Sequence, residues 1–208
     1  MCGIFRGGGK KYMDDKRKFD GVIFDMDGTL IDSGLDFSAI RSELGIGQGV
    51  GVIEAIEQMP APSRAEAEAK LLAHELAGAG RATLLPGVAV VLDTCRALGM
   101  KSALLTRNTR RAVDIAMERF EDLRFDLIRC REDGIVKPEP DGVLIACQAM
   151  GVEPQRTVSL GDFHFDIIAA NAAGLVSVLL TTSPNWQDFA HEADHVIDKL
   201  EDFLTIIA

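Results

Sequence analysis

The chain alternates short apolar runs with amphipathic stretches, and this alternation limits its possible folds more than any other feature. The apolar runs have the length and composition of strands that are buried on both faces. They lie at 20–25, 101–106, 125–129, 156–161 and 175–181, with a weaker run at 195–197. The stretches between them have helical spacing and lie at 88–99, 110–120, 140–150, 166–173 and 199–206. This order predicts an α/β fold in which helices cover both faces of a parallel sheet.

The interval 33–84 breaks the alternation because it is helical throughout, with expected helices at 36–44, at 50–58 and from Ser63 onward. Ser63 and Glu66 have the spacing of a capping box that opens the last of these helices. Pro60 and Pro62 are expected to end the helix before it. We therefore expect a small helical cap inserted after the first strand.

Three segments follow from this division. We expect residues 1–18 to form a flexible N-terminal extension, 19–32 together with 85–208 to form the core, and 33–84 to form the helical cap. Pro86 and Gly87 mark the return from the cap to the sheet.

Charge and composition exclude several kinds of partner. The formal net charge of the 208 residues is -10, which repels nucleic acids and anionic membrane surfaces. No apolar stretch has the length of a membrane span, and the N-terminus lacks the apolar region of a signal peptide. The cysteines are widely spaced, as in a protein with reduced thiols, at Cys2, Cys95, Cys130 and Cys147. We expect a cytoplasmic protein.

The first apolar run ends in two aspartates, Asp25 and Asp27, within the sequence FDMDGT. Alternate side chains of an extended segment face the same way, so both carboxylates can point into one site. Two such charges repel each other unless a cation lies between them, and hard oxygen ligands suit Mg²⁺. Gly28 allows a sharp turn close to a ligand. An acidic turn of no function is the alternative interpretation.

Other polar residues follow the later strands. Thr106 ends the run at 101–106 and Asn108 lies two residues beyond it, with a hydroxyl and backbone N–H groups suited to phosphoryl oxygens. Lys137 lies in a turn before Pro138. Asp162 directly follows the run at 156–161, and Asp166 comes four residues later. Since ligands bind beyond the carboxyl ends of parallel strands, we expect these side chains to share one site.

In this order, DMDGT, LLT, the Lys-Pro pair and GDxxxD resemble the four motifs of the haloacid dehalogenase superfamily, over residues 20–198. The helical insertion after the first motif is similar to that of the phosphoglycolate phosphatase-like branch. The resemblance implies a Rossmann-like sheet in a three-layer α/β/α arrangement.

The resemblance also implies roles for the two aspartates of the first motif. Asp25 would be the nucleophile that forms an aspartyl-phosphate. Asp27 would be the general acid for the leaving oxygen and then the base for water. Dehalogenases of this fold lack an acid at the second position, so Asp27 favours phosphate chemistry.

The remaining motifs would hold the metal and the phosphoryl group. By the same resemblance, Asp25, Asp162 and the main-chain carbonyl of Asp27 would hold Mg²⁺, with Asp166 as a direct or water-mediated ligand. Thr106 and Lys137 would stabilise the charge on the transferring phosphoryl group.

Arg107 departs from the family pattern, since many relatives carry Asn directly after the threonine. This arginine either contacts a substrate carboxylate or reaches solvent. We group it with Thr106, Asn108 and Lys137 as candidates for substrate binding. The cap is short and Gly-rich at 45–51, which weakens any transfer of substrate specificity.

The resulting expectation is a Mg²⁺-dependent phosphatase that acts on a small phosphorylated metabolite, as a monomer or homodimer. The substrate would be 2-phosphoglycolate or a sugar phosphate. A phosphotransferase of the β-phosphoglucomutase type would share every catalytic residue. A non-catalytic binding or regulatory protein of the same fold is the alternative from a different class.

Overall fold

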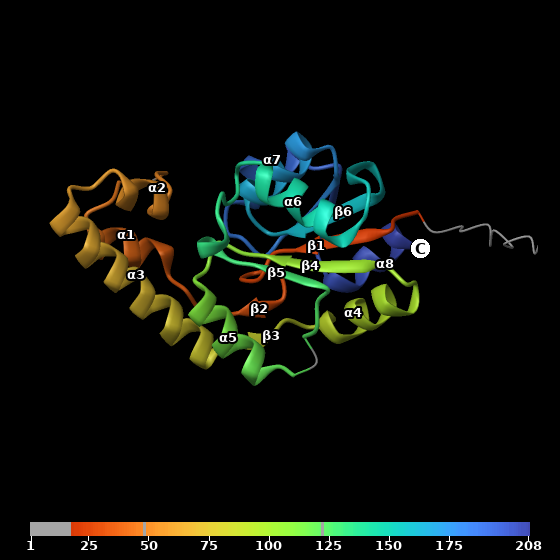
Figure 1. Ribbon diagram of the computed structural model, residues 1–208, viewed down its shortest axis with the longest axis horizontal. Coiled ribbons are helices and arrows are strands. Elements are labelled where there is room, and N and C mark those ends of the chain that lie inside the picture. Colours follow the sequence, from red (N-terminus) through yellow and green to blue (C-terminus); the bar gives the residue numbers. More distant parts are fainter. Residues whose placement is uncertain (1–17, 48, 122) are drawn as a thin grey trace, which may run out of the picture.

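A parallel six-stranded sheet forms the centre of the computed structural model, which describes residues 18–47, 49–121 and 123–208. The strand order is β5-β4-β1-β6-β7-β8 (Figure 1). The strands are β1 (Gly21–Phe24), β4 (Lys101–Leu105), β5 (Leu127–Arg129), β6 (Thr157–Gly161), β7 (Val176–Leu180) and β8 (His195–Ile197). Each apolar run of the sequence forms one of these strands, and every pairing is parallel, so the predicted sheet is confirmed.

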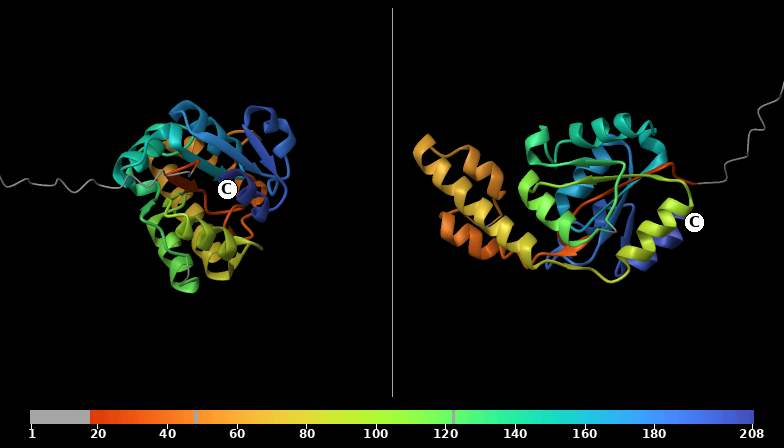
Figure 2. Two further views of the ribbon diagram at one scale, coloured as in Figure 1. Left: turned by 90° about the vertical axis from the view of Figure 1, so that its right-hand side faces the viewer. Right: turned by 60° about the horizontal axis from the view of Figure 1, so that its bottom comes forward.

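Helices cover both faces of this sheet (Figures 1 and 2). On one side lie α4 (Val88–Ala97), α5 (Arg110–Arg119) and α8 (Phe203–Ile207), and on the other lie α6 (Asp141–Met150) and α7 (His164–Ala173). Successive β1 side chains explain the two layers, because Val22 and Phe24 pack into one hydrophobic cluster and Ile23 into the other. The expected Rossmann-like α/β fold is therefore confirmed.

Single 3-10 turns occupy several of the connections. They are η1 (Arg131–Asp133), η2 (Pro154–Arg156), η3 (Trp186–Asp188), η4 (Ala190–Glu192) and η5 (Leu200–Asp202). The helix expected over 199–206 is thus divided between η5 and α8.

β1 lies at the point where the chain changes direction across the sheet. It pairs with β4 on one side and with β6 on the other. The connections to these two neighbours therefore diverge at its carboxyl end. In open α/β sheets a crevice at such a point is the usual place for a ligand.

The interval between β1 and α4 holds three helices of its own, α1 (Phe37–Leu44), α2 (Val52–Glu57) and α3 (Ala61–Arg81). They share a small hydrophobic cluster and project beyond one end of the sheet (Figure 1). The domain boundaries that we placed at 33 and 84 stay a prediction.

Two short strands that the sequence did not predict join this insertion to the core. They are β2 (Ile31–Asp32) and β3 (Thr83–Leu84), and they pair antiparallel, with Ile31 opposite Leu84. Where the chain enters and leaves the insertion, its two segments are thus held together.

The predicted start of the long cap helix was wrong. α3 begins at Ala61, its N-cap is Pro60, and no side chain caps it. Pro62 lies in its first turn, where the fixed φ of proline suits a helix and its missing N–H is not needed. Glu66 forms an ion pair with Lys70 at 2.9 Å instead of a capping box with Ser63.

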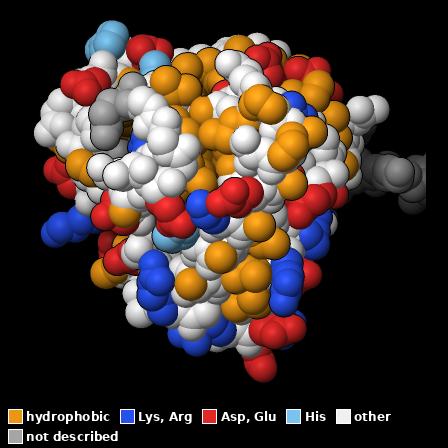
Figure 3. Space-filling model, turned by 90° about the vertical axis from the view of Figure 1, so that its left-hand side faces the viewer, with side chains coloured by type: hydrophobic (Ala, Val, Ile, Leu, Met, Phe, Trp, Pro, Cys, Tyr) orange, Lys and Arg blue, Asp and Glu red, His pale blue; other side chains and the backbone are white. Residues whose placement is uncertain are grey.

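The expected N-terminal extension lies outside the described residues, apart from Lys18. Over the described part of the chain, no helix combines the length and apolar character needed to cross a membrane. On the side that bears the cap, acidic and basic side chains are interspersed around an area of hydrophobic ones (Figure 3).

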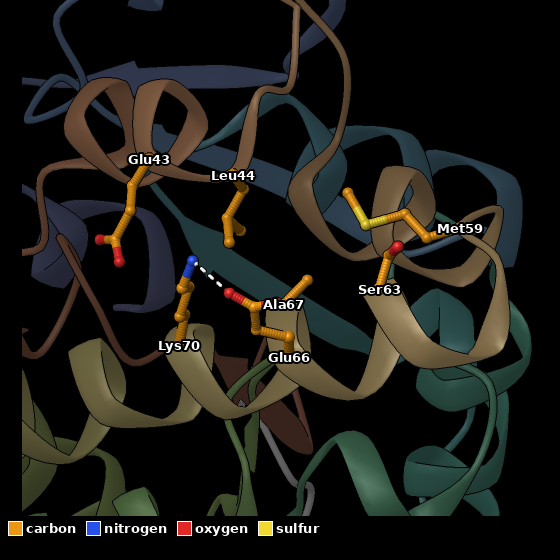
Figure 4. Close-up of a pocket in the computed structure, with 7 residues that line it drawn as sticks. All are labelled: Glu43, Leu44, Met59, Ser63, Glu66, Ala67 and Lys70. Carbon is orange, nitrogen blue, oxygen red and sulfur yellow. Dashed lines mark ion pairs between the residues drawn. The ribbon is translucent and has the colours of Figure 1, made fainter.

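A small pocket lies within the cap, between α1 and α3 (Figure 4). It is lined by Glu43, Leu44, Met59, Ser63, Glu66, Ala67 and Lys70. None of these side chains belongs to the motifs at the strand ends, so this pocket is separate from the candidate site.

Candidate active site

β1 delivers Asp25 and Asp27 to the carboxyl edge of the sheet. The backbone N–H of Asp25 donates to the carbonyl of Leu160 at 2.9 Å, which continues the pairing with β6 beyond the end of β1. Met26, between the two aspartates, is buried in the hydrophobic core. The aspartates on either side of it therefore lie on the opposite side of the chain, at the surface of the core.

Three carboxylates from separate motifs meet at this edge. Asp25, Asp162 and Asp166 each offer an oxygen, and these oxygens all lie within 4.8 Å of one another. Asp162 directly follows β6, and Asp166 lies in the first turn of α7. The backbone N–H of Phe163 donates to Asp166 at 3.1 Å and fixes its carboxylate there.

Two glycines make room for these carboxylates. Gly28 has a φ of +73°, a conformation that residues with a side chain rarely adopt, and a Cβ on it would collide with the Asp162 carboxylate. A Cβ on Gly161 would collide with Asp166. A side chain at either glycine would therefore displace a carboxylate of the cluster.

Among the described residues, Lys137 is the one cation that contacts the carboxylate cluster, and it lies in the loop before α6. Its Nζ donates to Asp25 at 2.5 Å and also to Asp166. The Lys137–Pro138 peptide bond is cis. Burial alone would lower the pKa of Lys137, but Asp166 and Asp25 outweigh that effect and raise it, so the side chain stays charged.

One lysine does not balance this much negative charge. Burial raises the pKa of Asp25 to about 7, against the opposing effect of Lys137 and with a further contribution from Asp166. Burial, reinforced by Asp25 and Asp166, also raises the pKa of Asp162 well above its ordinary range. A further cation beside these carboxylates would stabilise their charged forms and offset part of the cost of burying them.

The residue types present fit Mg²⁺. Asp25, Asp162 and Asp166 supply hard carboxylate oxygens, which this ion prefers. In addition, Oδ1 of Asp27 is buried and has no hydrogen-bond partner among the described residues. The oxygens of Asp25, Asp162 and Asp166 are available to a divalent cation, and Oδ1 of Asp27 is available to a water beside it.

The loop after β4 carries the next group of expected residues. Thr106 and Asn108 are buried, and the backbone N–H of Asn108 donates to Oγ1 of Thr106 at 3.1 Å. Nδ2 of Asn108 donates to Oδ2 of Asp27. Burial raises the pKa of Asp27, while the interactions of its carboxyl group with Ser33 and Asn108 oppose the rise.

Arg107, between these two residues, points toward the cap. It donates to Glu54 of α2 at 2.5 Å, and its guanidinium lies 4.5 Å from the centre of the Phe165 ring. All the residues expected at the site thus lie at one edge of the sheet, but Arg107 meets a cap carboxylate there. Their chemical roles stay predictions.

Several residues around the site were missed in the sequence. Glu54 and Glu75 lie on helices of the insertion, where glutamate is a common residue and carries no signal of a distant partner. Thr182 donates to the carbonyl of Gly28 at 2.5 Å. It lies two residues beyond β7, so the strand-end rule could have found it.

Comparison with known proteins gives one consistent result. A family model described as haloacid dehalogenase-like hydrolase matches residues 19–174. A haloacid dehalogenase-like hydrolase domain-containing protein of Arabidopsis thaliana is 30% identical over 177 residues, 79% of this chain and 72% of the relative. Phosphoglycolate phosphatase 1 of Pseudomonas aeruginosa is 30% identical over 211 residues, 88% of this chain and 78% of the relative. The crystal structure of a hydrolase from Pseudomonas syringae has a TM-score of 0.74 at 21% identity, covering 91% of this chain and 99% of that one.

Proposed function

The chain belongs to the haloacid dehalogenase-like hydrolases, and from that premise we propose that it is a Mg²⁺-dependent phosphatase of small phosphomonoesters. The substrate would be 2-phosphoglycolate or a sugar phosphate, and the name of the Pseudomonas aeruginosa relative supports the former. The observation that carries the proposal is the contact of Lys137 with both Asp25 and Asp166, beside Asp162. A buried cation among carboxylates suits a phosphoryl group that arrives with a divalent metal.

In the first step, a carboxylate oxygen of Asp25 attacks phosphorus. The new O–P bond forms an aspartyl-phosphate, and the bond from phosphorus to the substrate oxygen breaks. Oδ1 of Asp25 accepts the hydrogen bond from Lys137, which leaves Oδ2 for the attack. Lys137 therefore orients the nucleophile and faces the charge that develops on the phosphoryl oxygens.

Asp27 supplies the proton that the leaving oxygen needs. The raised pKa of its buried carboxyl group supports this role, because more of the protonated form is present near neutral pH. In the second step, Asp27 takes a proton from water while the water oxygen attacks phosphorus and the bond to Asp25 breaks. The hydrogen bond from Asn108 holds the carboxyl group in place for both transfers.

Mg²⁺ held by Asp25, Asp162 and Asp166 would neutralise negative charge on the phosphoryl oxygens. Thr106 would add a hydroxyl donor to the same oxygens, from a buried position beside Asn108. The substrate is a freely diffusing metabolite, and a cytoplasmic monomer or homodimer remains our expectation. No observation favours the phosphotransferase, and a non-catalytic role would leave this set of groups without a use.

The test is phosphate release from a panel of small phosphomonoesters that includes 2-phosphoglycolate, assayed with Mg²⁺ and with EDTA. We expect release that depends on Mg²⁺ and is lost in the Asp25→Asn variant. Asp114, on the exposed face of α5, offers a matched control, since Asp114→Asn removes one exposed carboxylate that is not part of the cluster.

A circular dichroism spectrum and a melting curve show whether each variant is folded. Folded wild-type protein that releases phosphate from no ester would contradict the proposal. Activity that survives in Asp25→Asn would contradict the assignment of the nucleophile.

A further inference from the structure

Arg107 lies where three parts of the molecule meet at the candidate site. It belongs to the loop after β4, between Thr106 and Asn108. Its guanidinium stacks over Phe165, which precedes the cluster residue Asp166. It also reaches α2 of the insertion through Glu54, and its side chain is only 19% exposed. A strong hydrogen-bond donor is therefore held in a fixed position between the loop after β4, the first turn of α7 and the insertion.

The contact between Arg107 and Glu54 leaves most N–H donors of the guanidinium and one carboxylate oxygen unused. A guanidinium has five N–H donors in a fork that matches both oxygens of a carboxylate. Among the described residues, Arg107 makes one hydrogen bond, to Oε1 of Glu54. Oε2 of Glu54 is buried and without a partner in the same part of the chain.

The backbone geometry explains why the second oxygen of Glu54 is not paired. The carboxylate folds back against Gly51, the N-cap residue of α2, and a Cβ on Gly51 would collide with Oε2. Because the Glu54 side chain is 38% exposed, the ion pair is also partly screened by water. A carboxylate free to orient itself would pair better with the same guanidinium.

We propose that Arg107 selects phosphomonoesters that carry a carboxylate, and that Glu54 occupies its guanidinium until such a substrate binds. This inference rests on the proposed phosphatase function. Lys137 is already shared between Asp25 and Asp166, so it serves the phosphoryl group. Arg107 provides a separate cation for the other end of the substrate, and the Phe165 ring keeps its plane fixed.

The test compares two substrates that differ in one group. In 2-phosphoglycolate a carboxylate stands where 2-hydroxyethyl phosphate has a neutral hydroxymethyl group. We expect wild-type protein to prefer the former. We expect Arg107→Gln to lose about 10- to 100-fold in kcat/KM for 2-phosphoglycolate, mostly through KM, because a hydrogen-bonded charge contact is lost. The loss for 2-hydroxyethyl phosphate should be much smaller.

Two further variants complete the comparison. Arg111→Gln removes an arginine from the exposed face of α5 and should match wild type on both substrates. Glu54→Gln removes the competing charge, so the KM for 2-phosphoglycolate should fall while the KM for 2-hydroxyethyl phosphate stays the same. Equal losses on both substrates in Glu54→Gln would mean that the pair only holds the cap, and would overturn the proposal.

Failure of this inference can be told apart from failure of the proposed function. If wild type hydrolyses both esters and Arg107→Gln loses equally on each, the phosphatase stands and selection by Arg107 is wrong. If wild type hydrolyses neither, the phosphatase is wrong. Calorimetric titration of both esters into Asp25→Asn, with and without Arg107→Gln, then measures selection without turnover. Equal affinities for the two esters would overturn the role of Arg107.

Discussion

Asp25, Asp162 and Asp166 gather negative charge at a buried edge of the sheet, and their contacts show how the chain tolerates it. Lys137 is paired with two of the three. Burial, reinforced by the remaining repulsion, raises the pKa values of Asp25 and Asp162. Removing one partner from a buried charged group usually costs more than the pair contributes, so these residues depend on one another.

Because the carboxylate cluster carries this charge, we expect the stabilisation of the protein by Mg²⁺ to depend on pH. The pKa of Asp25 is raised from 3.8 to about 7, so the folded metal-free site keeps protons that the unfolded chain releases. The free energy of unfolding of the metal-free protein therefore falls as pH rises from 3.8 to about 7. Because Mg²⁺ binds the deprotonated carboxylates, the rise in Tm that it causes should be larger at about pH 8 than at about pH 5.

Thermal unfolding in Mg²⁺ and in EDTA measures this difference directly. Asp162→Asn should shrink the Tm increment at every pH, because one ligand oxygen is lost. An increment that is the same at both pH values would contradict the link between protonation and metal binding at this cluster.

Asp27 predicts a dependence on the leaving group. If its carboxyl group protonates the leaving oxygen, Asp27→Asn should slow alkyl phosphates far more than p-nitrophenyl phosphate, whose leaving group needs little help. The measurement is kcat for both esters in both proteins. Equal losses on the two esters would count against the acid role, although they would leave Asp25 as the nucleophile.

At the scale of an element, the turn that follows β1 holds the site together. Gly28 has a φ of +73° and lies against Asp162, while Gly151 has a φ of +69° and no atom within 4 Å of a Cβ built on it. Alanine at either position should cost about 1–2 kcal/mol of backbone strain. Gly28→Ala should in addition displace Asp162, and so lose both phosphatase activity and the Mg²⁺-dependent rise in Tm.

Gly151→Ala is the matched control, because it introduces the same strain far from the carboxylates. It should melt at a lower temperature but keep its activity. If the two variants lost activity equally, strain alone would explain the loss and the close approach of Gly28 to Asp162 would be irrelevant.

The long helix α3 is tied to the core by one buried carboxylate. Glu75 accepts hydrogen bonds from the backbone N–H of Thr109 at 3.3 Å and from its hydroxyl at 3.0 Å, and it forms an ion pair with Arg131. Glu75→Ala leaves these donors without their partner, which should cost about 1–3 kcal/mol of unfolding free energy. Urea denaturation measures the change.

Glu68→Ala, on the exposed part of α3, is the control for helix propensity and charge. It should change the unfolding free energy by no more than about 0.5 kcal/mol. If both variants lost the same amount, the contacts of Glu75 with the core would contribute nothing measurable.

For the molecule as a whole, the sequence predicted those features that a single physical rule imposes on many residues, namely the strands and the edge where the site lies. Strands buried on both faces must be apolar throughout, so every strand of the main sheet could be located from its run. The position of Asp25 and Asp162 directly after such strands then predicted the edge at which they meet.

The features that were missed depend on how the insertion sits on the core. Glu54 meets Arg107 across 53 positions of the chain, and Glu75 meets Arg131 across 56. No local pattern encodes a pairing at that distance. β2 and β3 are two residues each, too short for a periodic signal. The start of α3 was misplaced because proline can end one helix or open another.

The reactivity of the buried cysteines reports on the packing of the helical layers on both sides of the sheet. Cys95 lies in the cluster under α4, Cys147 lies in the cluster under α6, and Cys130 follows β5; all three are buried and free. Burial raises the pKa of Cys95 to about 12 and that of Cys130 to about 11, and it also raises the pKa of Cys147. Thiolates, the reactive form, are therefore scarce in the folded protein.

In a Cys2→Ser background, we expect these three thiols to react with Ellman's reagent only as fast as the protein opens, and to react at once in urea. Because they lie on both sides of the sheet, a single slow rate would mean that the two layers open together. A faster rate for Cys130 alone would assign the weaker packing to the side of β5. Immediate reaction of the native protein at all three positions would contradict the packing of both layers.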